Sequence, residues 1–291
     1  MKEKPDCVIV YGDTNSTLAG ALAAAKLHIP VAHVEAGLRS FNRQMPEEIN
    51  RVLTDHISEL LFCPTKTAVK NLAQEGIFEG VYQVGDVMYD SVLFYAEKAK
   101  AMERKTLKKL DLQPKSYYLA TMHRAENTDN FKRMDSILSA FGQLDIPIVL
   151  PMHPRTRNKM LDKNSSKISG NLHIIEPVSY LEMMALERNA RAILTDSGGV
   201  QKEAYWFKVP CITLRDETEW VETVESGWNI VVGADRKSII NAVGAYSRLR
   251  SASPNTMYGD GHAAIQICNI FQRSTCNGVH NNFASLRGEA S

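Results

Sequence analysis

Several features are missing from this sequence, and each absence excludes a class of protein. No stretch of the 291 residues stays apolar over the roughly 18 residues that a membrane-spanning helix needs. Residues 1–6 are charged and lead directly into an apolar run, unlike a secretory signal peptide. Lys and Arg number 34 against 33 Asp and Glu, so the basic excess of a nucleic-acid-binding protein is absent. We therefore expect a cytoplasmic protein that binds neither membranes nor nucleic acid.

The sequence also lacks the usual signatures of disulfides, metals and redox cofactors. Its 5 cysteines are scattered and form no Cys-x-x-Cys pair, which predicts a reduced chain without structural zinc. No cluster of His, Cys and Asp has the spacing of metal ligands. No Gly-x-Gly-x-x-Gly occurs, so a nicotinamide site has no support. The sequence predicts no metal and no nicotinamide cofactor.

Short β-branched apolar runs alternate with helical patterns, which predicts parallel sheets built from βαβ units. In the first half we expect strands at residues 7–11, 30–34, 60–63 and 81–84, and helices at 17–27, 47–61 and 65–74. A polar helix at 90–109 serves as a connector, and the pattern then restarts. In the second half we expect strands at 117–122, 146–152, 172–175, 192–195, 211–214 and 229–232, and helices at 131–141, 180–188, 201–207 and 236–249. The fold class is α/β with two Rossmann-like domains.

The domain boundaries follow from the connector. We expect an N-terminal domain at 1–86, to which a last helix near 261–273 returns, a C-terminal domain at 87–260, and a tail at 274–291. Only four strand signals precede the connector, whereas a doubly wound sheet has about five or six and opens with its first β–α turn. The first domain is therefore expected to be incomplete at its N-terminus.

Three carboxylates follow strands of the first half. In an open parallel sheet, ligands bind outside the carboxyl ends of the strands. Asp13 follows the first strand, Glu35 follows the second, and Glu47 opens the next helix. Each has an ordinary alternative as a helix cap, a solvated loop residue or a partner of the helix dipole. Together at one edge, they suit the removal of a proton from carbon.

Two histidines take the corresponding places in the second half. His123 follows its first strand and His153 follows the next. Each is accompanied by an arginine, at Arg124 and Arg155. A His–Arg pair opening a loop suggests an acid or base beside an anion, although a lone His after a strand is usually structural.

The sharpest signal is Asp-Ser-Gly-Gly-Val-Gln-Lys-Glu at residues 196–203. We expect Ser197, Gly198 and Gly199 to form the turn between a strand and a helix, where backbone N–H groups bind a diphosphate. Glu203 lies farther into that helix, where its carboxylate could accept ribose hydroxyls. Arg215 follows the next strand and either adds charge at the same phosphates or pairs with its acidic neighbours.

Five motifs occur in a fixed order, namely Gly12-Asp-Thr, His33-Val-Glu-Ala-Gly-Leu-Arg, Pro46-Glu-Glu-Ile-Asn-Arg, His123-Arg-Ala-Glu-Asn and Asp196-Ser-Gly-Gly-Val-Gln-Lys-Glu. Over about residues 5–271 they closely resemble the non-hydrolysing UDP-N-acetylglucosamine 2-epimerases. The resemblance implies a GT-B-like fold with the active site in the interdomain cleft, a UDP-sugar substrate, a homodimer, and neither metal nor nicotinamide. It implies interconversion of UDP-N-acetylglucosamine and UDP-N-acetylmannosamine through elimination and re-addition of UDP, with 2-acetamidoglucal as the intermediate.

The family's functional residues carry over onto matching positions. The candidate catalytic groups match Asp13, Glu35, Glu47 and His123, with the acid and the base left unassigned. The positions that contact UDP match Arg51, His153, Ser197, Gly198, Gly199 and Glu203.

Two departures from the family pattern keep other functions open. The family's N-terminal segment, with its Gly-Thr-Arg-Pro-Glu-type loop, is absent, and Thr-Glu-Trp-Val at 218–221 stands where well-known members have Thr-Glu-Arg-Pro. The alternatives are an epimerase of a related UDP-2,3-diacetamido sugar acid, a hydrolysing epimerase, a GT-B glycosyltransferase, or an inactive truncated chain that binds UDP.

Overall fold

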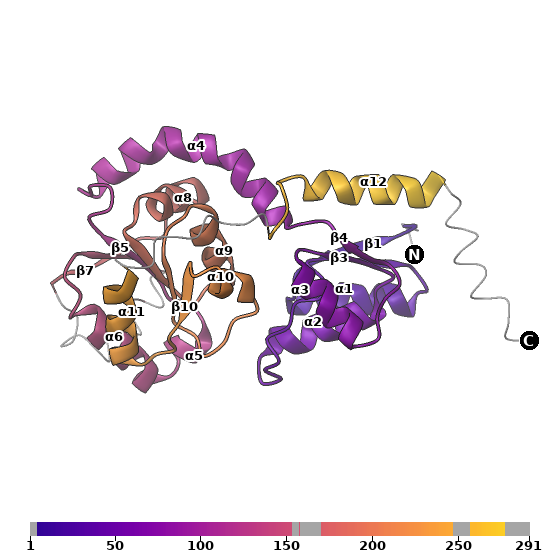
Figure 1. The fold of residues 1–291 in the computed structure, drawn as a ribbon, viewed down its shortest axis with the longest axis horizontal. Coiled ribbons are helices and arrows are strands. Elements are labelled where there is room, and N and C mark those ends of the chain that lie inside the picture. The colour runs from indigo at the N-terminus through magenta and orange to yellow at the C-terminus, as the bar shows by residue number, and fades with distance from the viewer. Residues whose placement is uncertain (1–4, 153–156, 158–169, 247–256, 277–291) are drawn as a thin grey trace, which may run out of the picture. The chain divides into compact units, whose positions relative to one another are not determined.

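The computed structural model describes residues 5–152, 157, 170–246 and 257–276. The chain divides into two compact units, residues 1–91 with 256–291 and residues 92–255 (Figure 1). Each unit has its own parallel sheet, as the alternating pattern predicted.

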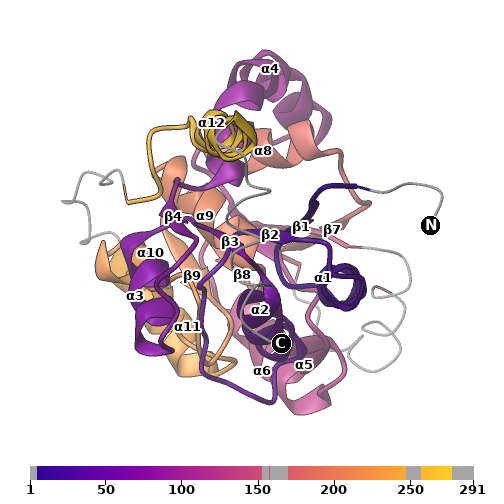
Figure 2. The ribbon, with the colours of Figure 1, turned by 90° about the vertical axis from the view of Figure 1, so that its right-hand side faces the viewer.

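The sheet of the first unit has four parallel strands in the order β1-β2-β3-β4. They are β1 (Val8–Tyr11), β2 (Val31–Val34), β3 (Leu60–Cys63) and β4 (Val81–Gln83). One face is covered by α1 (Asn15–Lys26), α2 (Pro46–Ile57) and α3 (Lys66–Gln74), and the other by α12 (Ala263–Cys276) (Figures 1 and 2). All four strands lie where the sequence predicted them.

Alternate residues of β2 supply the two cores of this unit. Val31 packs with Val10 and with the alanines of α1, whereas Ala32 and Val34 pack with Phe62 and with Ile267 of α12. Side chains alternate between the faces of a strand, so a continuously apolar strand suits a sheet covered on both sides. This packing holds the carboxyl ends of β1 and β2, and the loops that follow them, in fixed positions.

The sheet of the second unit has six parallel strands in the order β10-β9-β8-β5-β6-β7. They are β5 (Tyr118–Thr121), β6 (Ile148–Pro151), β7 (Leu172–Ile175), β8 (Ala192–Thr195), β9 (Cys211–Thr213) and β10 (Asn229–Val231). The described helices are α5 (Ala125–Thr128), α6 (Phe131–Phe141), α8 (Tyr180–Asn189), α9 (Gly198–Trp206), α10 (Val221–Glu225) and α11 (Arg236–Ala245), with α4 (Val87–Lys109) leading into the unit. Apolar residues of α6 and α11 fill one face of the sheet, and those of α4, α8 and α9 fill the other.

Some predicted element boundaries were wrong, for local reasons. Gly198 and Gly199 form the first turn of α9 and not the preceding loop, because the Ser197 side chain accepts the Val200 N–H and caps the helix there. The helix predicted to extend to residue 61 ends at Ile57, because Leu60 already belongs to β3. The short helices α5 and α10 were not predicted, since a single helical turn carries no readable periodicity.

Two further features differ from the expected outline. The connector helix α4 begins at Val87, and it buries Val92, Ala99 and Leu107. Helix α12 continues to Cys276, beyond the expected start of the tail, and the rest of that tail lies outside the described residues.

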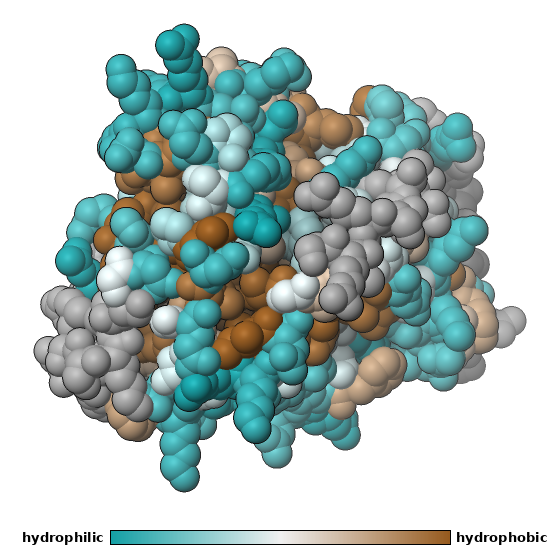
Figure 3. Space-filling view, turned by 60° about the vertical axis from the view of Figure 1, so that its left-hand side comes forward, coloured by the Kyte–Doolittle hydropathy of each residue, from teal (hydrophilic) through white to brown (hydrophobic). Residues whose placement is uncertain are grey.

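The surface shown in Figure 3 carries hydrophilic side chains over most of its area, with apolar side chains gathered in patches between them. The described helices include none with the length and apolar character needed to cross a membrane.

Candidate functional site

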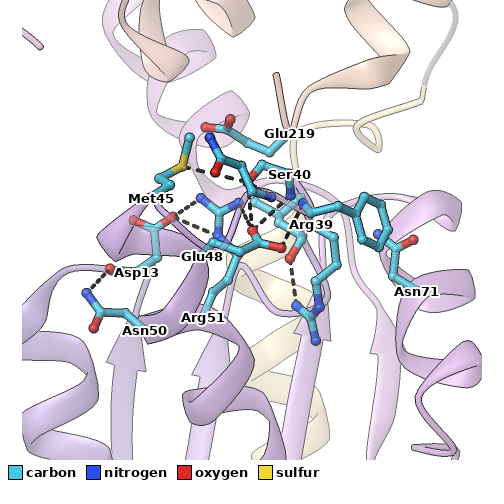
Figure 4. A network of polar contacts seen from close by, with 12 residues as sticks. Asp13, Arg39, Ser40, Met45, Glu48, Asn50, Arg51, Asn71 and Glu219 are labelled. Carbon is cyan, nitrogen blue, oxygen red and sulfur yellow. Dashed lines mark hydrogen bonds and ion pairs between the residues drawn. The ribbon is translucent and has the colours of Figure 1, made fainter. Parts of the chain in front are cut away.

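Asp13, at the end of β1, is held by an arginine of α2. The Arg51 guanidinium donates to Asp13 Oδ2 from Nη2 at 2.5 Å and from Nε at 3.1 Å (Figure 4). Asn50, one residue earlier on α2, donates to the backbone carbonyl of Asp13 at 2.9 Å. Two donors from the first turns of α2 therefore fix both the side chain and the backbone of Asp13. Sequence analysis placed Asp13 and Arg51 in different roles, and the structure joins them as an ion pair.

The other side of Arg51 contacts Glu48, which sequence analysis missed. Glu48 is buried, and its carboxylate accepts Arg51 Nη1 at 3.0 Å and the backbone N–H groups of Ser40 and Phe41 at 2.8 and 2.9 Å. These bonds tie the loop between β2 and α2 to the first turn of α2 (Figure 4). The signal was available, because Glu48 stands three residues before Arg51, a spacing that brings side chains together on a helix.

Glu35 and Glu47 are both half-buried at this end of the sheet. Glu35 has a positive φ of 76°, and a Cβ placed on Gly12 would lie 3.7 Å from Glu35 Oε1. The Glu35 carboxylate therefore lies beside the turn that leads to Asp13. Glu47 lies in the first turn of α2, next to Glu48. The catalytic roles of these carboxylates remain predictions.

Behind these loops lies a second charged network. Asp55 of α2 accepts Arg39 Nη1 at 2.6 Å, and Arg39 also donates to Glu75 from Nε at 2.6 Å and from Nη2 at 2.8 Å. Burial by itself lowers the pKa of Arg39, but hydrogen bonds and charges from Glu75 and Asp55 outweigh it and raise that pKa. The hydrogen bond from Arg39 in turn lowers the pKa of Glu75. Arg39 and Glu75 are therefore a charged pair, and the network ties the loop after β2 to α2 and to the end of α3.

In the second unit, Asp196 at the end of β8 organises the candidate site. Its fully buried carboxylate accepts the backbone N–H groups of His123 and Arg124 and the Asn127 side chain, each at 3.1 Å, and lies 3.1 Å from His123 Nδ1. Burial alone would raise the pKa of Asp196, but the bonds from His123 and Asn127 lower it. The His123 side chain is 61% exposed, so Asp196 orients an imidazole that solvent reaches.

The first turn of α9 packs against the loop that follows β9. A Cβ on Gly198 would lie 2.8 Å from Trp220 Nε1 and 2.9 Å from Glu219 Oε1, so a larger residue there would have to displace one of these side chains. The buried Arg215 donates to Glu219 Oε2 at 2.8 Å, which is the acidic pairing that the sequence offered as one alternative. Contacts of Ser197, Gly198, Gly199 and Arg215 with a diphosphate remain predictions.

Glu203 lies farther along α9 and is almost fully buried. Burial raises its pKa, while the neighbouring Tyr180 and Glu187 side chains and the charge of Lys202 act in the opposite direction. Its neighbour Glu187 on α8 is completely buried, and this burial, followed by the charge of Glu203, raises the pKa of Glu187 well above its usual value. The protonated form of Glu187 is therefore favoured more than in an exposed glutamate.

The predicted role of His153 and the predicted absence of a metal both stay predictions. His153, predicted to contact UDP, lies outside the described residues. Within the described part of the chain, no group of three or more His, Cys, Asp or Glu side chains is placed to hold a metal ion.

Comparisons with known proteins test the family that the motifs indicated. The sequence pattern of the family described as UDP-N-acetylglucosamine 2-epimerase matches residues 1–272. The chain belongs to the UDP-N-acetylglucosamine 2-epimerase family. This confirms the family that the five motifs indicated.

Two relatives and one solved structure are similar to this chain over most of its length. A UDP-N-acetylglucosamine 2-epimerase homolog of Methanococcus maripaludis is 54% identical over 94% of this chain and 77% of its own length. The UDP-2,3-diacetamido-2,3-dideoxy-D-glucuronate 2-epimerase of Pseudomonas aeruginosa is 50% identical over 92% of this chain and 75% of its own. The crystal structure of the Methanocaldococcus jannaschii UDP-GlcNAc 2-epimerase with UDP-GlcNAc and UDP aligns with a TM-score of 0.86 at 47% identity, over 94% of this chain and 77% of that one. These matches confirm the GT-B-like fold class.

The structure adds site residues that sequence analysis passed over, and most stand inside the motifs already singled out. Glu48 and Asn50 lie between Pro46 and Arg51, Asn127 ends the His123 motif, and Asp196 begins the glycine motif. Asp196 could have been singled out, because it follows an apolar run and stands directly before the start of a helix. Asp55 had no such signal, because it lies in the last turn of a helix and follows no strand.

Proposed function

We propose that this chain interconverts UDP-N-acetylglucosamine and UDP-N-acetylmannosamine. A base removes the proton from carbon 2 of the sugar, and the bond from carbon 1 to the diphosphate oxygen breaks, which releases UDP and leaves 2-acetamidoglucal. UDP then re-forms the bond to carbon 1 while a proton returns to carbon 2 on the opposite face. No oxidation occurs, and every substrate atom returns to the product except the carbon 2 proton, which is replaced by a proton from an acid that exchanges with solvent.

The arrangement of Asp13, Arg51 and Glu35 carries this proposal. Proton transfer to and from carbon needs carboxylates held in place, since a small displacement of a reacting group costs much of the rate. Asp13 is fixed through its side chain by Arg51 and through its backbone by Asn50, and Glu35 lies beside Gly12. In this proposal Asp13, Glu35 and Glu47 transfer the protons at carbon 2.

The second unit would bind and release UDP. Asp196 orients the His123 ring through Nδ1, and His123 assists the departure of the diphosphate. In the second unit we assign the UDP contacts to His153, Ser197, Gly198, Gly199, Glu203 and Arg215, and in the first unit to Arg51. Support comes from the solved M. jannaschii relative, whose structure contains UDP-GlcNAc and UDP.

We further propose that the enzyme works as a homodimer in the cytoplasm, which rests on the family resemblance. Analytical ultracentrifugation of the purified chain measures the oligomeric state, and a monomer at assay concentration contradicts the dimer.

The test is proton NMR of the purified protein with UDP-N-acetylglucosamine in deuterated water. We expect deuterium at carbon 2, accumulation of UDP-N-acetylmannosamine and little free UDP. D13N should abolish both the deuterium incorporation and the formation of UDP-N-acetylmannosamine, whereas D216N, at an exposed aspartate, is the matched control and should retain both. A folded wild-type protein that exchanges no deuterium contradicts the proposal.

The same experiment separates the other functions. Free UDP that accumulates together with free sugar indicates a hydrolysing epimerase, and turnover only with an added acceptor indicates a glycosyltransferase. A parallel sample with a UDP-2,3-diacetamido glucuronate tests the reaction named for the P. aeruginosa relative. Exchange of that sugar alone would overturn the assignment of UDP-N-acetylglucosamine as the substrate.

A further inference from the structure

His33, near the end of β2, has a hydrogen-bond acceptor at each of its two ring nitrogens. Nδ1 lies 2.6 Å from Asp55 Oδ1, and Nε2 lies 2.8 Å from the backbone carbonyl oxygen of Gly12. The side chain is completely buried. A carbonyl oxygen can only accept, so Nε2 must carry a proton. A neutral imidazole carries one proton and would then have none at Nδ1.

The proton between His33 and Asp55 belongs to the histidine. The other oxygen of Asp55 accepts the Gly37 N–H at 3.1 Å and Arg39 Nη1 at 2.6 Å. An arginine guanidinium stays charged, and a cation in direct contact keeps a carboxylate ionised. An ionised Asp55 has no proton to donate, so the 2.6 Å contact requires N–H at His33 Nδ1.

The charges around His33 then balance. Asp55 on α2 faces His33 and Arg39, and Glu75 at the end of α3 accepts two bonds from Arg39 and lies 3.0 Å from His56 Nε2. Two buried cations and two carboxylates form the centre of the network, and a buried imidazolium is tolerable because it is paired and fully hydrogen-bonded. Cys63 on β3 is also near this network, and burial raises the pKa of its thiol.

We propose that His33 is a doubly protonated positioning residue that joins the loops carrying Asp13 and Glu35. The proposal rests on the proposed function, which makes these carboxylates catalytic. Through Nε2 the ring holds the carbonyl of Gly12, the residue before Asp13, and through Asp55 it reaches Gly37, two residues after Glu35. The loss of either ring proton would release one of these loops.

The protonation state is tested directly by nitrogen-15 NMR of the full chain labelled at its histidines. At about pH 7.5 most unperturbed histidines are neutral, whereas we expect both His33 ring nitrogens to give protonated imidazolium signals. The signals are assigned by their loss in H33Q. A non-protonated ring nitrogen at His33 overturns the proposal, whatever the enzyme turns over.

The positioning role is tested by activity. Glutamine can donate at only one end of its amide, so H33Q keeps one of the two bonds. We expect kcat to fall about 10- to 100-fold with little change in KM, because the carboxylates that react are displaced. Deuterium exchange at carbon 2 should fall in parallel. H262Q, at an exposed histidine 3.3 Å from Asp260, is the matched control and should stay within about twofold.

The outcomes distinguish this proposal from the proposed function. An H33Q enzyme that is folded and has wild-type kcat contradicts the positioning role while leaving epimerase activity intact. A wild-type protein without exchange contradicts the function, and the NMR measurement of the ring still decides the charge on His33.

Discussion

Each unit places acidic residues near the carboxyl ends of its own parallel strands, but the two units stabilise these residues with different partners. In the first unit the buried Glu48 and Asp55 each contact an arginine, Arg51 and Arg39. In the second unit the buried Asp196 contacts two backbone N–H groups, an asparagine and a histidine. In the first unit Glu48 and Asp55 are therefore paired with full positive charges, whereas Asp196 in the second unit is held mostly by peptide and amide dipoles.

The loop lengths explain the difference. In the first unit a loop of residues 35–45 separates β2 from α2, so long side chains must reach across to fix it. In the second unit β8 ends at Thr195, and the helix cap is already at Ser197. Asp196 therefore stays beside the neighbouring strand β5, and the backbone N–H groups of His123 and Arg124, which follow β5, reach it. We expect the two arrangements to respond differently to mutation.

D196N should have the largest effect on stability. Asparagine has only one acceptor oxygen, and its amide group would face the donors of His123, Arg124 or Asn127. We expect the free energy of unfolding to fall by about 2–4 kcal/mol, the usual cost of breaking a buried charged network. Urea denaturation measures it. D216N, which removes half of the exposed pair with Arg133, should cost less than about 1 kcal/mol. Equal losses in the two variants would contradict a central role for Asp196.

The lowered pKa of Asp196 also gives this loss a pH dependence. Its stabilising effect is present above the pKa of an unfolded aspartate and disappears as the pH falls through the lower pKa of the folded state. The gap in unfolding free energy between wild type and D196N should therefore narrow in acid.

R51K should lower activity more than stability, and it tests the charged arrangement of the first unit. A lysine ammonium keeps the charge but cannot make two bonds to Asp13 and one to Glu48 in a fixed geometry. We expect kcat/KM to fall about 10- to 100-fold. R43K, at an exposed arginine of the loop before α2, is the matched control. If R51K retains wild-type kcat/KM, charge alone suffices at this position.

E187Q should have the smallest effect at low pH and an increasing one as the pH rises. The raised pKa of Glu187 means that the unfolded chain loses this proton before the folded chain does. Wild type therefore loses stability above the unfolded pKa, by up to about 1.4 kcal/mol for each pH unit, until the folded pKa is reached.

Glutamine does not titrate, so E187Q should gain stability relative to wild type as the pH rises from the unfolded pKa of a glutamate to the raised pKa of the folded Glu187. Urea denaturation at several pH values measures this difference. E225Q replaces an exposed glutamate and shows how much a Glu-to-Gln substitution changes the unfolding free energy without burial. A stability difference that does not change with pH would show that Glu187 is ionised in the folded protein.

Local patterns predicted much of the site but not its connections. Asp13, Glu35 and His123 could be placed after strands, because a short apolar run ending in a polar residue is readable in one dimension. Their partners could not be read in this way. Asp196 meets His123 across 73 positions of sequence, because β5 and β8 are neighbours in the sheet. Nothing in the sequence of either strand shows that β5 and β8 lie next to each other.

By itself, the sequence determined that two parallel α/β sheets form, where their strands lie and which polar residues follow them, because these depend on short-range periodicity and turn chemistry. Only the tertiary structure decided which charge is paired with which. Arg51 could have served Glu47 one helical turn earlier, yet it contacts Asp13 and Glu48. His33 could have been an ordinary core histidine, yet the chain places an acceptor at each of its nitrogens. Such pairings depend on distances between segments that only packing brings together.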